Sequence, residues 1–183
     1  QKMIQNVAAE FAKDYCEPEA AEIDRTHEFP LNTWEKMVEV GLVEVNHSEE
    51  FGGAGLDPIA EVLVIEELSK VSLTHGALYA LMGHGFPTFI EKFGTKEQKE
   101  EYIPKIIKEG MIGGFCLTEP DAGSDAQGVK TFCKKDGDYY VINGAKCFIT
   151  AGDVSDYLLV VAKADESAGE KGFNGFIVDT KTP

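Results

Sequence analysis

Two short segments of the chain carry the residue types best suited to chemistry. The first, residues 115–125, ends an apolar run in a turn that contains proline, glycine and carboxylates. The second, residues 143–150, begins at an Asn-Gly pair and places Phe148 and Thr150 two positions apart. Because alternate residues of a strand share one face, we expect these two side chains to point the same way. Together the segments offer flat apolar surface, hydroxyl groups and a turn of small residues.

These features match what a flavin requires from a protein. The ring system needs an apolar face, its N1–C2=O edge needs hydrogen-bond donors, and its pyrophosphate needs small residues that expose backbone N–H groups. The three requirements are met in turn by Leu117 and Phe148, by Thr118 and Thr150, and by Gly123 with Ser124. Taken singly, each residue also fits a structural role as a strand threonine, a core aromatic or a turn residue. The ordered set favours the flavin interpretation.

The order of these residues resembles the acyl-CoA dehydrogenase family. The family pattern of an aromatic, a variable and an aliphatic residue, then Thr-Glu-Pro and Gly-Ser-Asp, is matched from Phe115 to Asp125. A second pattern, Gly-x-Lys followed by an aromatic residue and Ile-Thr, is matched from Gly144 to Thr150. Residues 50–55 and 93–98 also resemble family segments, so the resemblance covers essentially the whole chain. Two departures are Phe148, where the family usually has Trp, and Ala151, where Asn is commoner.

The resemblance implies FAD as the cofactor, and it implies a role for each matching residue. Phe115, Leu117 and Thr118 line the isoalloxazine, and Thr118 bonds its pyrimidine edge. Gly123 and Ser124 lie at the pyrophosphate, with Ser124 also near the acyl-CoA substrate. Phe148 packs beside the ring system, and Thr150 reaches towards N5.

The resemblance also implies an activity, the α,β-dehydrogenation of an acyl-CoA thioester. In the family a carboxylate removes the α-proton while a hydride passes to flavin N5. We expect that base in a C-terminal helical domain that lies outside this chain, because we expect the chain to be part of a longer protein. No catalytic residue is therefore assigned within the chain. The implied partners are an electron-transfer flavoprotein and further copies in a homotetramer or homodimer. Alternatives are an enoyl-CoA reductase of an anaerobe, a flavin oxidase or monooxygenase, and a non-catalytic binding subunit.

Hydrophobic periodicity predicts an α+β chain with its helices first. Residues 1–111 show helical spacing, with breaks predicted at Pro18 and across residues 83–87. Thr95 with Gln98 predicts a capping box for a last helix over residues 96–109, which Gly110 ends. Residues 112–183 show short alternating strands with turns at Asp136-Gly137 and at Asn143-Gly144. We therefore expect an N-terminal helical domain, 1–111, followed by an antiparallel β-barrel-like or β-sandwich domain, 112–183, which is incomplete.

Composition narrows the class of partner. The formal net charge of −15 argues against a nucleic-acid partner, because phosphate binding requires clustered Lys and Arg. The four cysteines show no CxxC spacing, which favours a reducing compartment, and no apolar run is long enough to span a membrane. The acidic balance favours a bacterial cytoplasm, with the mitochondrial matrix as the alternative. None of the four histidines has partners at metal-binding spacing, so no metal site is predicted.

The apolar segment from Leu78 to Met82, between His75 and His84, leaves two interpretations open. The first is an ordinary helix end followed by a loop. The second, which rests on the family resemblance, is that the segment lines the pocket for the acyl chain.

Overall fold

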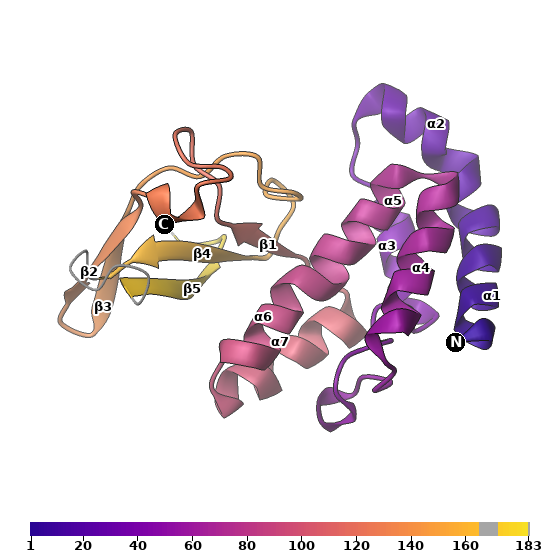
Figure 1. Ribbon diagram of the computed structural model, residues 1–183, viewed down its shortest axis with the longest axis horizontal. Helices are drawn as coiled ribbons and strands as arrows, with labels where there is room; N and C mark the ends of the chain where they lie inside the picture. Colours follow the sequence, from indigo (N-terminus) through magenta and orange to yellow (C-terminus); the bar gives the residue numbers. More distant parts are fainter. Residues whose placement is uncertain (165–171, 183) are drawn as a thin grey trace. The chain divides into compact units, whose positions relative to one another are not determined.

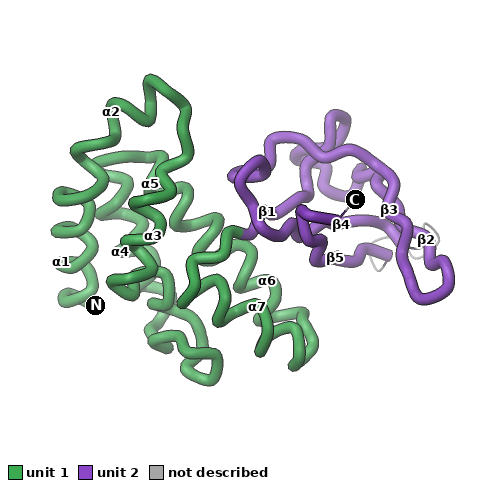
Figure 2. Tube along the Cα trace, turned by 180° about the vertical axis from the view of Figure 1, so that it is seen from behind, with its two compact units in different colours: residues 1–112 green, residues 113–183 purple. Residues whose placement is uncertain are grey.

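The computed structural model describes residues 1–164 and 172–182 of the 183-residue chain (Figure 1). The chain divides into two compact units, Gln1–Ile112 and Gly113–Pro183, which Figure 2 distinguishes by colour. Helices occupy the first unit and the described strands the second, so the α+β prediction is confirmed. Among the described residues no helix combines the length and the apolarity that a bilayer crossing requires.

The first unit is built from helices that follow one another closely. They are α1 (Lys2–Phe11), η1 (Ala12–Cys16), α2 (Glu17–Thr26), α3 (Leu31–Glu39), η2 (Glu49–Phe51), α4 (Pro58–Val71), α5 (Leu73–Leu78), η3 (Tyr79–Gly85), α6 (Phe86–Phe93) and α7 (Lys96–Glu109). Their largest fully buried side chains include Trp34, Tyr79 and Phe86. Trp34 donates its indole N–H to the carbonyl oxygen of Gly110 at 2.8 Å, which fixes the end of α7 against α3.

The helix breaks predicted at Pro18 and around Pro87 are wrong, because helical backbone runs through both prolines. In each case a π-helical turn, η1 or η3, directly precedes the α-helix that contains the proline. The residue before each proline makes a bond five residues back, from Glu17 N–H to the Ala12 carbonyl and from Phe86 N–H to the Leu81 carbonyl. The wider π turn shifts the helical N–H to C=O hydrogen bonds just before the proline, which has no N–H to donate. The helix therefore continues through the proline.

Both ends of α7 follow their sequence signals. Thr95 and Gln98 form the expected capping box, in which each side chain accepts a hydrogen bond from the other residue's backbone N–H. Gly110 ends the helix in the left-handed conformation, with φ 76°. The sequence therefore predicts this helix to the residue.

The second unit is a five-stranded sheet made of β1 (Gly113–Cys116), β2 (Phe132–Asp136), β3 (Tyr139–Asn143), β4 (Tyr157–Lys163) and β5 (Phe173–Asp179), with the short helix η4 (Ala126–Gly128). The predicted hairpin is present, since β2 and β3 pair antiparallel from Phe132–Asn143 to Asp136–Tyr139. β4 pairs antiparallel with β5 along its whole length.

The sheet is mixed, where the prediction had antiparallel strands throughout. β1 runs parallel to β4, with Gly113 opposite Tyr157, and β2 meets β4 in parallel only at Phe132 and Lys163. A parallel neighbour needs a long crossover connection, and the residues between β1 and β4 supply one of 40 residues, 117–156. That long connection contains most of the residues predicted to bind flavin.

The strand predicted over residues 145–150 is also wrong. This segment has no strand ladder, and one backbone hydrogen bond, from Cys147 N–H to the Thr118 carbonyl at 3.0 Å, ties it to the segment that follows β1. Phe148 and Ala151 lie in the left-handed region, with φ 56° and 57°, which interrupts the alternation of a strand. Phe148 and Thr150 therefore do not share a strand face, although both side chains are exposed.

Candidate functional site

The segment after β1 makes a tight turn before it reaches the predicted pyrophosphate residues. Glu119 and Ala122 exchange both backbone hydrogen bonds, at 2.9 and 3.1 Å. Gly123 and Ser124 follow this turn in exposed positions. Asp125 then accepts a hydrogen bond from the Gly128 N–H at 3.2 Å and caps η4. The turn and the cap hold the Gly-Ser pair at the surface between two fixed points.

Gly123 is not a glycine that the fold itself requires. A Cβ placed on it would meet no atom within 4 Å, and its φ is not positive. Gly144 differs, because its φ is 157° and a Cβ there would lie 2.2 Å from the Thr131 hydroxyl oxygen. The open space at Gly123 is what close approach of a phosphate group to the backbone would demand.

Phe148 combines two features that cost stability. Its side chain is 92% exposed, and its backbone has φ 56°, a conformation that disfavours a residue with a Cβ by roughly 1–2 kcal/mol. A non-glycine residue held in an unfavourable backbone conformation is a candidate for a functional role. The residue thus presents a flat apolar face outside the core of its own unit.

A buried ion pair ties the two candidate segments together. Lys146 Nζ donates to Glu119 Oε1 at 2.8 Å and to the Leu117 carbonyl at 2.9 Å. The two charged side chains are 10% and 5% exposed. The backbone N–H groups of Lys130 and Thr131 donate to the same carboxylate at 2.6 and 2.9 Å. We call this arrangement of Glu119 with Lys146 the carboxylate–lysine clamp.

Electrostatics favour the ionised carboxylate in the clamp. Burial raises the pKa of Glu119, but the Lys146 ammonium and the backbone donors of Lys130 and Thr131 outweigh it and lower the pKa to about 2. In the sequence, Glu119 lies within a turn and Lys146 within the Gly-x-Lys pattern. Their 27-residue separation left no local signal that they pair.

The structure gives each predicted site residue a definite place within the second unit. Phe115 lies on β1 and is 37% exposed, Leu117 and Thr118 are half-buried directly after it, and Gly123, Ser124, Phe148 and Thr150 are exposed. The bond from Cys147 to Thr118 and the clamp bring the segment 117–118 beside the segment 146–148. The Gly-Ser pair lies just beyond the turn at Glu119.

A groove of about 320 Å³ opens on the same unit, between the turn 119–121, residues 130–132 and residues 143–145. None of the seven predicted flavin residues lines it. The groove touches Glu119 of the clamp but does not coincide with the exposed surface of Phe148. It is therefore a separate feature of this unit.

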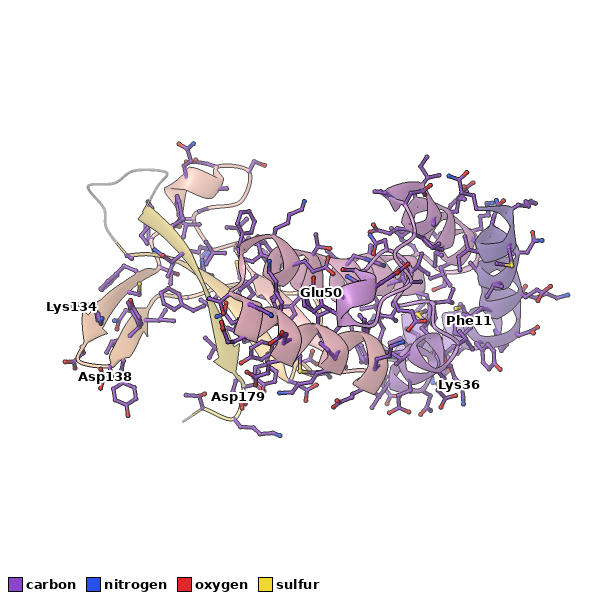
Figure 3. All side chains as sticks on the ribbon, turned by 90° about the horizontal axis from the view of Figure 1, so that it is seen from below. Phe11, Lys36, Glu50, Lys134, Asp138 and Asp179 are labelled. Atoms are coloured by element: carbon purple, nitrogen blue, oxygen red, sulfur yellow. The ribbon has the colours of Figure 1, made fainter. Side chains whose placement is uncertain are left out.

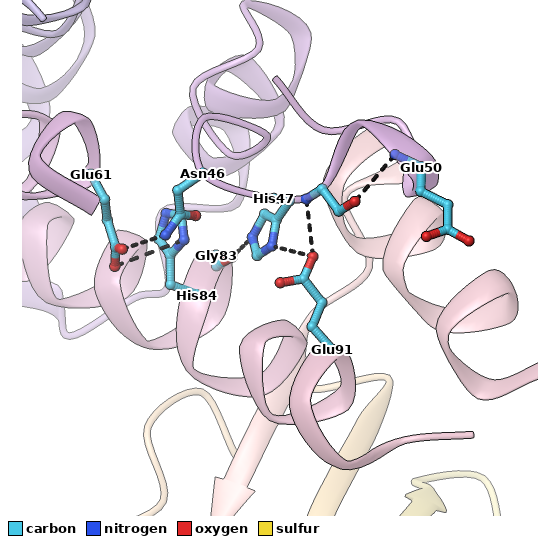
Figure 4. Close-up of polar contacts among 8 residues, drawn as sticks. Asn46, His47, Glu50, Glu61, Gly83, His84 and Glu91 are labelled. Atoms are coloured by element: carbon cyan, nitrogen blue, oxygen red, sulfur yellow. Dashed lines mark hydrogen bonds and ion pairs between the residues drawn. The ribbon is translucent and has the colours of Figure 1, made fainter. Parts of the chain in front are cut away.

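A second polar cluster lies inside the helical unit (Figure 4). His47 Nε2 donates to the Gly83 carbonyl at 2.6 Å, and its Nδ1 lies 3.3 Å from Glu91. His84, in η3, stacks on His47 with ring centroids 5.0 Å apart, and its Nδ1 lies 3.8 Å from Glu61. Burial and the neighbouring His47 lower the pKa of His84 to about 3. Among the described residues no three His, Cys, Asp or Glu side chains are grouped so that they could hold a metal ion.

The segment 78–82 resolves into buried and exposed positions. Leu78, Tyr79 and Met82 are buried, whereas Leu81 is 45% exposed. The backbone from Leu73 to Phe93 is helical throughout, so the interpretation of a helix end followed by a loop is wrong. The interpretation that the segment 78–82 lines a pocket for the acyl chain stays a prediction.

The helical unit and the mixed-sheet unit form a two-part scaffold, and comparison with protein families assigns the chain. Residues 1–110 match the N-terminal domain of acyl-CoA dehydrogenases, and residues 114–183 match the middle domain of the same family. The chain belongs to the acyl-CoA dehydrogenase family.

Relatives in this family include enzymes named for opposite directions of reaction. The chain is 39% identical over 179 residues, 98% of its length, to a short-chain specific acyl-CoA dehydrogenase of Clostridium acetobutylicum. It is 40% identical over 185 residues, covering all of its length, to an acryloyl-CoA reductase (NADH) of Anaerotignum propionicum. The chain spans 47% of each of these relatives, about half their length.

Solved structures include one with the expected cofactor. An acyl-CoA dehydrogenase from Bacillus anthracis, determined in complex with FAD, aligns with a TM-score of 0.87 and 32% sequence identity. The alignment covers 98% of this chain and 31% of that one. The similarity to the Bacillus anthracis enzyme is a similarity of fold, and the FAD was found in that enzyme.

Proposed function

We propose that the protein binds FAD and oxidises an acyl-CoA thioester to the α,β-unsaturated product, with this chain forming one wall of the flavin site. The observation that carries the proposal is Phe148, whose ring is exposed and whose neighbour Cys147 bonds to the Thr118 carbonyl. Gly123 supports the proposal, because a Cβ there would meet no atom of this chain within 4 Å and the space beside its backbone is open to a ligand. Bound FAD would supply the acceptor of the hydride that leaves the β-carbon.

The residues of this chain would then act by holding and orienting. Phe115, Leu117 and Phe148 would present apolar surface to the ring system and keep water from one side of it. Thr118 and Thr150 would donate hydrogen bonds to the pyrimidine edge and towards N5. Gly123 and Ser124 would offer backbone N–H groups to the pyrophosphate, and Ser124 would also contact the acyl-CoA.

The proposed partners follow from the same assignment. Electrons would leave through an electron-transfer flavoprotein, and the protein would assemble as a homotetramer or homodimer. A bacterial cytoplasm is the proposed location, supported by the bacterial sources of the two relatives described above, with the mitochondrial matrix as the alternative.

A second candidate is the reverse reaction, reduction of an enoyl-CoA. The relative named acryloyl-CoA reductase favours it, with 40% identity along the whole chain. The same residues would bind the flavin in either direction. Direction therefore has to be measured on the whole protein.

The test is an anaerobic spectral titration of the whole protein with saturated acyl-CoAs of increasing chain length. We expect the flavin absorption band to bleach with one range of chain lengths, because oxidation of the substrate reduces the bound flavin. The reductase would be favoured by a different result. In that case no saturated acyl-CoA bleaches the flavin band, and an enoyl-CoA reoxidises flavin that dithionite has reduced. Rapid reoxidation by oxygen would favour an oxidase or monooxygenase, and a protein without flavin would contradict the proposal.

A further inference from the structure

The carboxylate–lysine clamp lies where the proposed flavin wall needs rigidity. The segment 145–150 carries Phe148 and Thr150 but lacks a strand ladder, and Cys147 supplies its one backbone bond to the segment after β1. Lys146 adds two further bonds, to the Leu117 carbonyl and to Glu119. The side chain of Lys146 is thus a main anchor of this segment.

Glu119 extends the anchor to a third segment. Its Oε1 accepts from Lys146 and from the Thr131 backbone N–H, and its Oε2 accepts from the Lys130 backbone N–H. One carboxylate therefore joins the turn after β1, the entry to β2 and the segment that bears Phe148. Both side chains are at most 10% exposed, so water cannot compensate the charge that remains when one partner is removed.

We propose that Lys146 and Glu119 are positioning residues of the flavin site, which fix the Leu117–Thr118 edge and the Phe148 ring at the spacing that the isoalloxazine requires. The inference rests on the proposed FAD binding but adds residues that the flavin does not touch. A buried pair of this kind contributes little to stability when compared with an apolar pair of similar volume, so a role in geometry explains why charges lie there. Loosening the clamp should then reduce flavin affinity more than it reduces folding.

The variants separate positioning from folding. Lys146→Met leaves Glu119 as an unpaired buried charge and tests the clamp most severely. The double variant Lys146→Met with Glu119→Gln removes both charges, so no buried ion is left unpaired. Lys146→Arg keeps the charge and the donors, and Lys134→Met removes an exposed lysine on the β2–β3 hairpin as the matched control (Figure 3).

Each variant is measured as the whole protein, by far-UV circular dichroism, FAD affinity and the visible spectrum of bound flavin. We expect the double variant to stay folded, to bind FAD at least about tenfold more weakly, equivalent to ~1.4 kcal/mol, and to show altered flavin bands. Lys146→Arg should recover most of the affinity, and Lys134→Met should match the wild type. The double variant should lose no more FAD affinity than Lys146→Met alone, because both substitutions break the same carboxylate–lysine clamp.

The outcomes distinguish this inference from the proposed function. A folded double variant with wild-type FAD affinity and spectrum would overturn the positioning role and leave the flavin site in place. Failure of Lys146→Arg to recover affinity where the double variant has lost it would also count against positioning by the charged pair. Absence of FAD binding in the wild-type protein would instead overturn the proposed function.

Discussion

At the scale of single residues, the candidate flavin wall combines the half-buried Leu117 and Thr118 with exposed side chains. The residue types at Leu117, Thr118 and Gly123 suggest a flavin site, which stays a prediction, and all three residues lie in the second unit. Phe148 was expected on a regular strand face, yet it lies in the left-handed region and is almost fully exposed. That conformation depends on its surroundings, because no side-chain preference of phenylalanine favours it.

The pairing of Glu119 with Lys146 shows where residue-level prediction stops. Each residue has an ordinary local interpretation, and only the return of the chain after β3 brings them within 2.8 Å. The carboxylate is also held by two backbone N–H groups, which have no signature in the side-chain sequence. Contacts of this kind follow from tertiary structure, and local patterns do not contain them.

Two glycines near the site allow a residue-scale test. We predict that Gly123→Ala leaves the melting temperature unchanged, because its Cβ would meet nothing, but weakens FAD binding several-fold by obstructing the pyrophosphate. Gly144→Ala should instead lower the melting temperature, since its Cβ would clash with Thr131. Melting curves and FAD titrations of both variants check this. Unaltered FAD affinity in Gly123→Ala would contradict the placement of the pyrophosphate.

At the scale of elements, helix ends with strong local signals were predictable and helix continuity was not. The capping box at Thr95 and the glycine at 110 end α7 as expected, because both signals act within one turn. Pro18 and Pro87 suggested breaks, but a π turn before each one lets the helix continue. No motif in the sequence indicated these π turns, and a proline alone indicates a helix end.

The element η3 carries a titratable group with a measurable consequence. His84 is 4% exposed, and its pKa of about 3 lies below the ordinary histidine value of about 6.5. Between these values the unfolded chain takes up a proton that the folded chain refuses. The contribution of neutral His84 to the free energy of unfolding is therefore fully present above pH 6.5 and is lost as the pH falls towards 3. Between pH 7 and pH 5 the loss is about 2 kcal/mol.

We predict that His84→Met flattens this dependence. The measurement is urea unfolding at pH 7 and pH 5, followed by the fluorescence of Trp34, the single tryptophan, which is buried in the helical unit. Glu61, which lies 3.8 Å from His84 and whose pKa is raised by burial, acts in the opposite direction. The exposed His27→Asn serves as the control and should keep the wild-type slope. Equal slopes in the wild type and His84→Met would contradict the assignment.

At the scale of the whole molecule, the order of helices before strands followed directly from the change of hydrophobic period. The pairing of the strands did not, because a local pattern predicts hairpins and cannot predict that β4 returns parallel to β1 after a connection of 40 residues. That same connection forms the candidate site. The part of the fold hardest to predict is thus the part that the proposed function uses.

The most direct test of the central claim is an equilibrium titration of the whole, flavin-depleted protein with FAD, followed by the fluorescence and visible absorption of the flavin. We predict saturable binding of FAD, with flavin bands that differ from those of free FAD because the ring would lie against Phe148 and the Leu117–Thr118 edge. Spectra that remain those of free FAD at every concentration would contradict the flavin site and the function proposed from it.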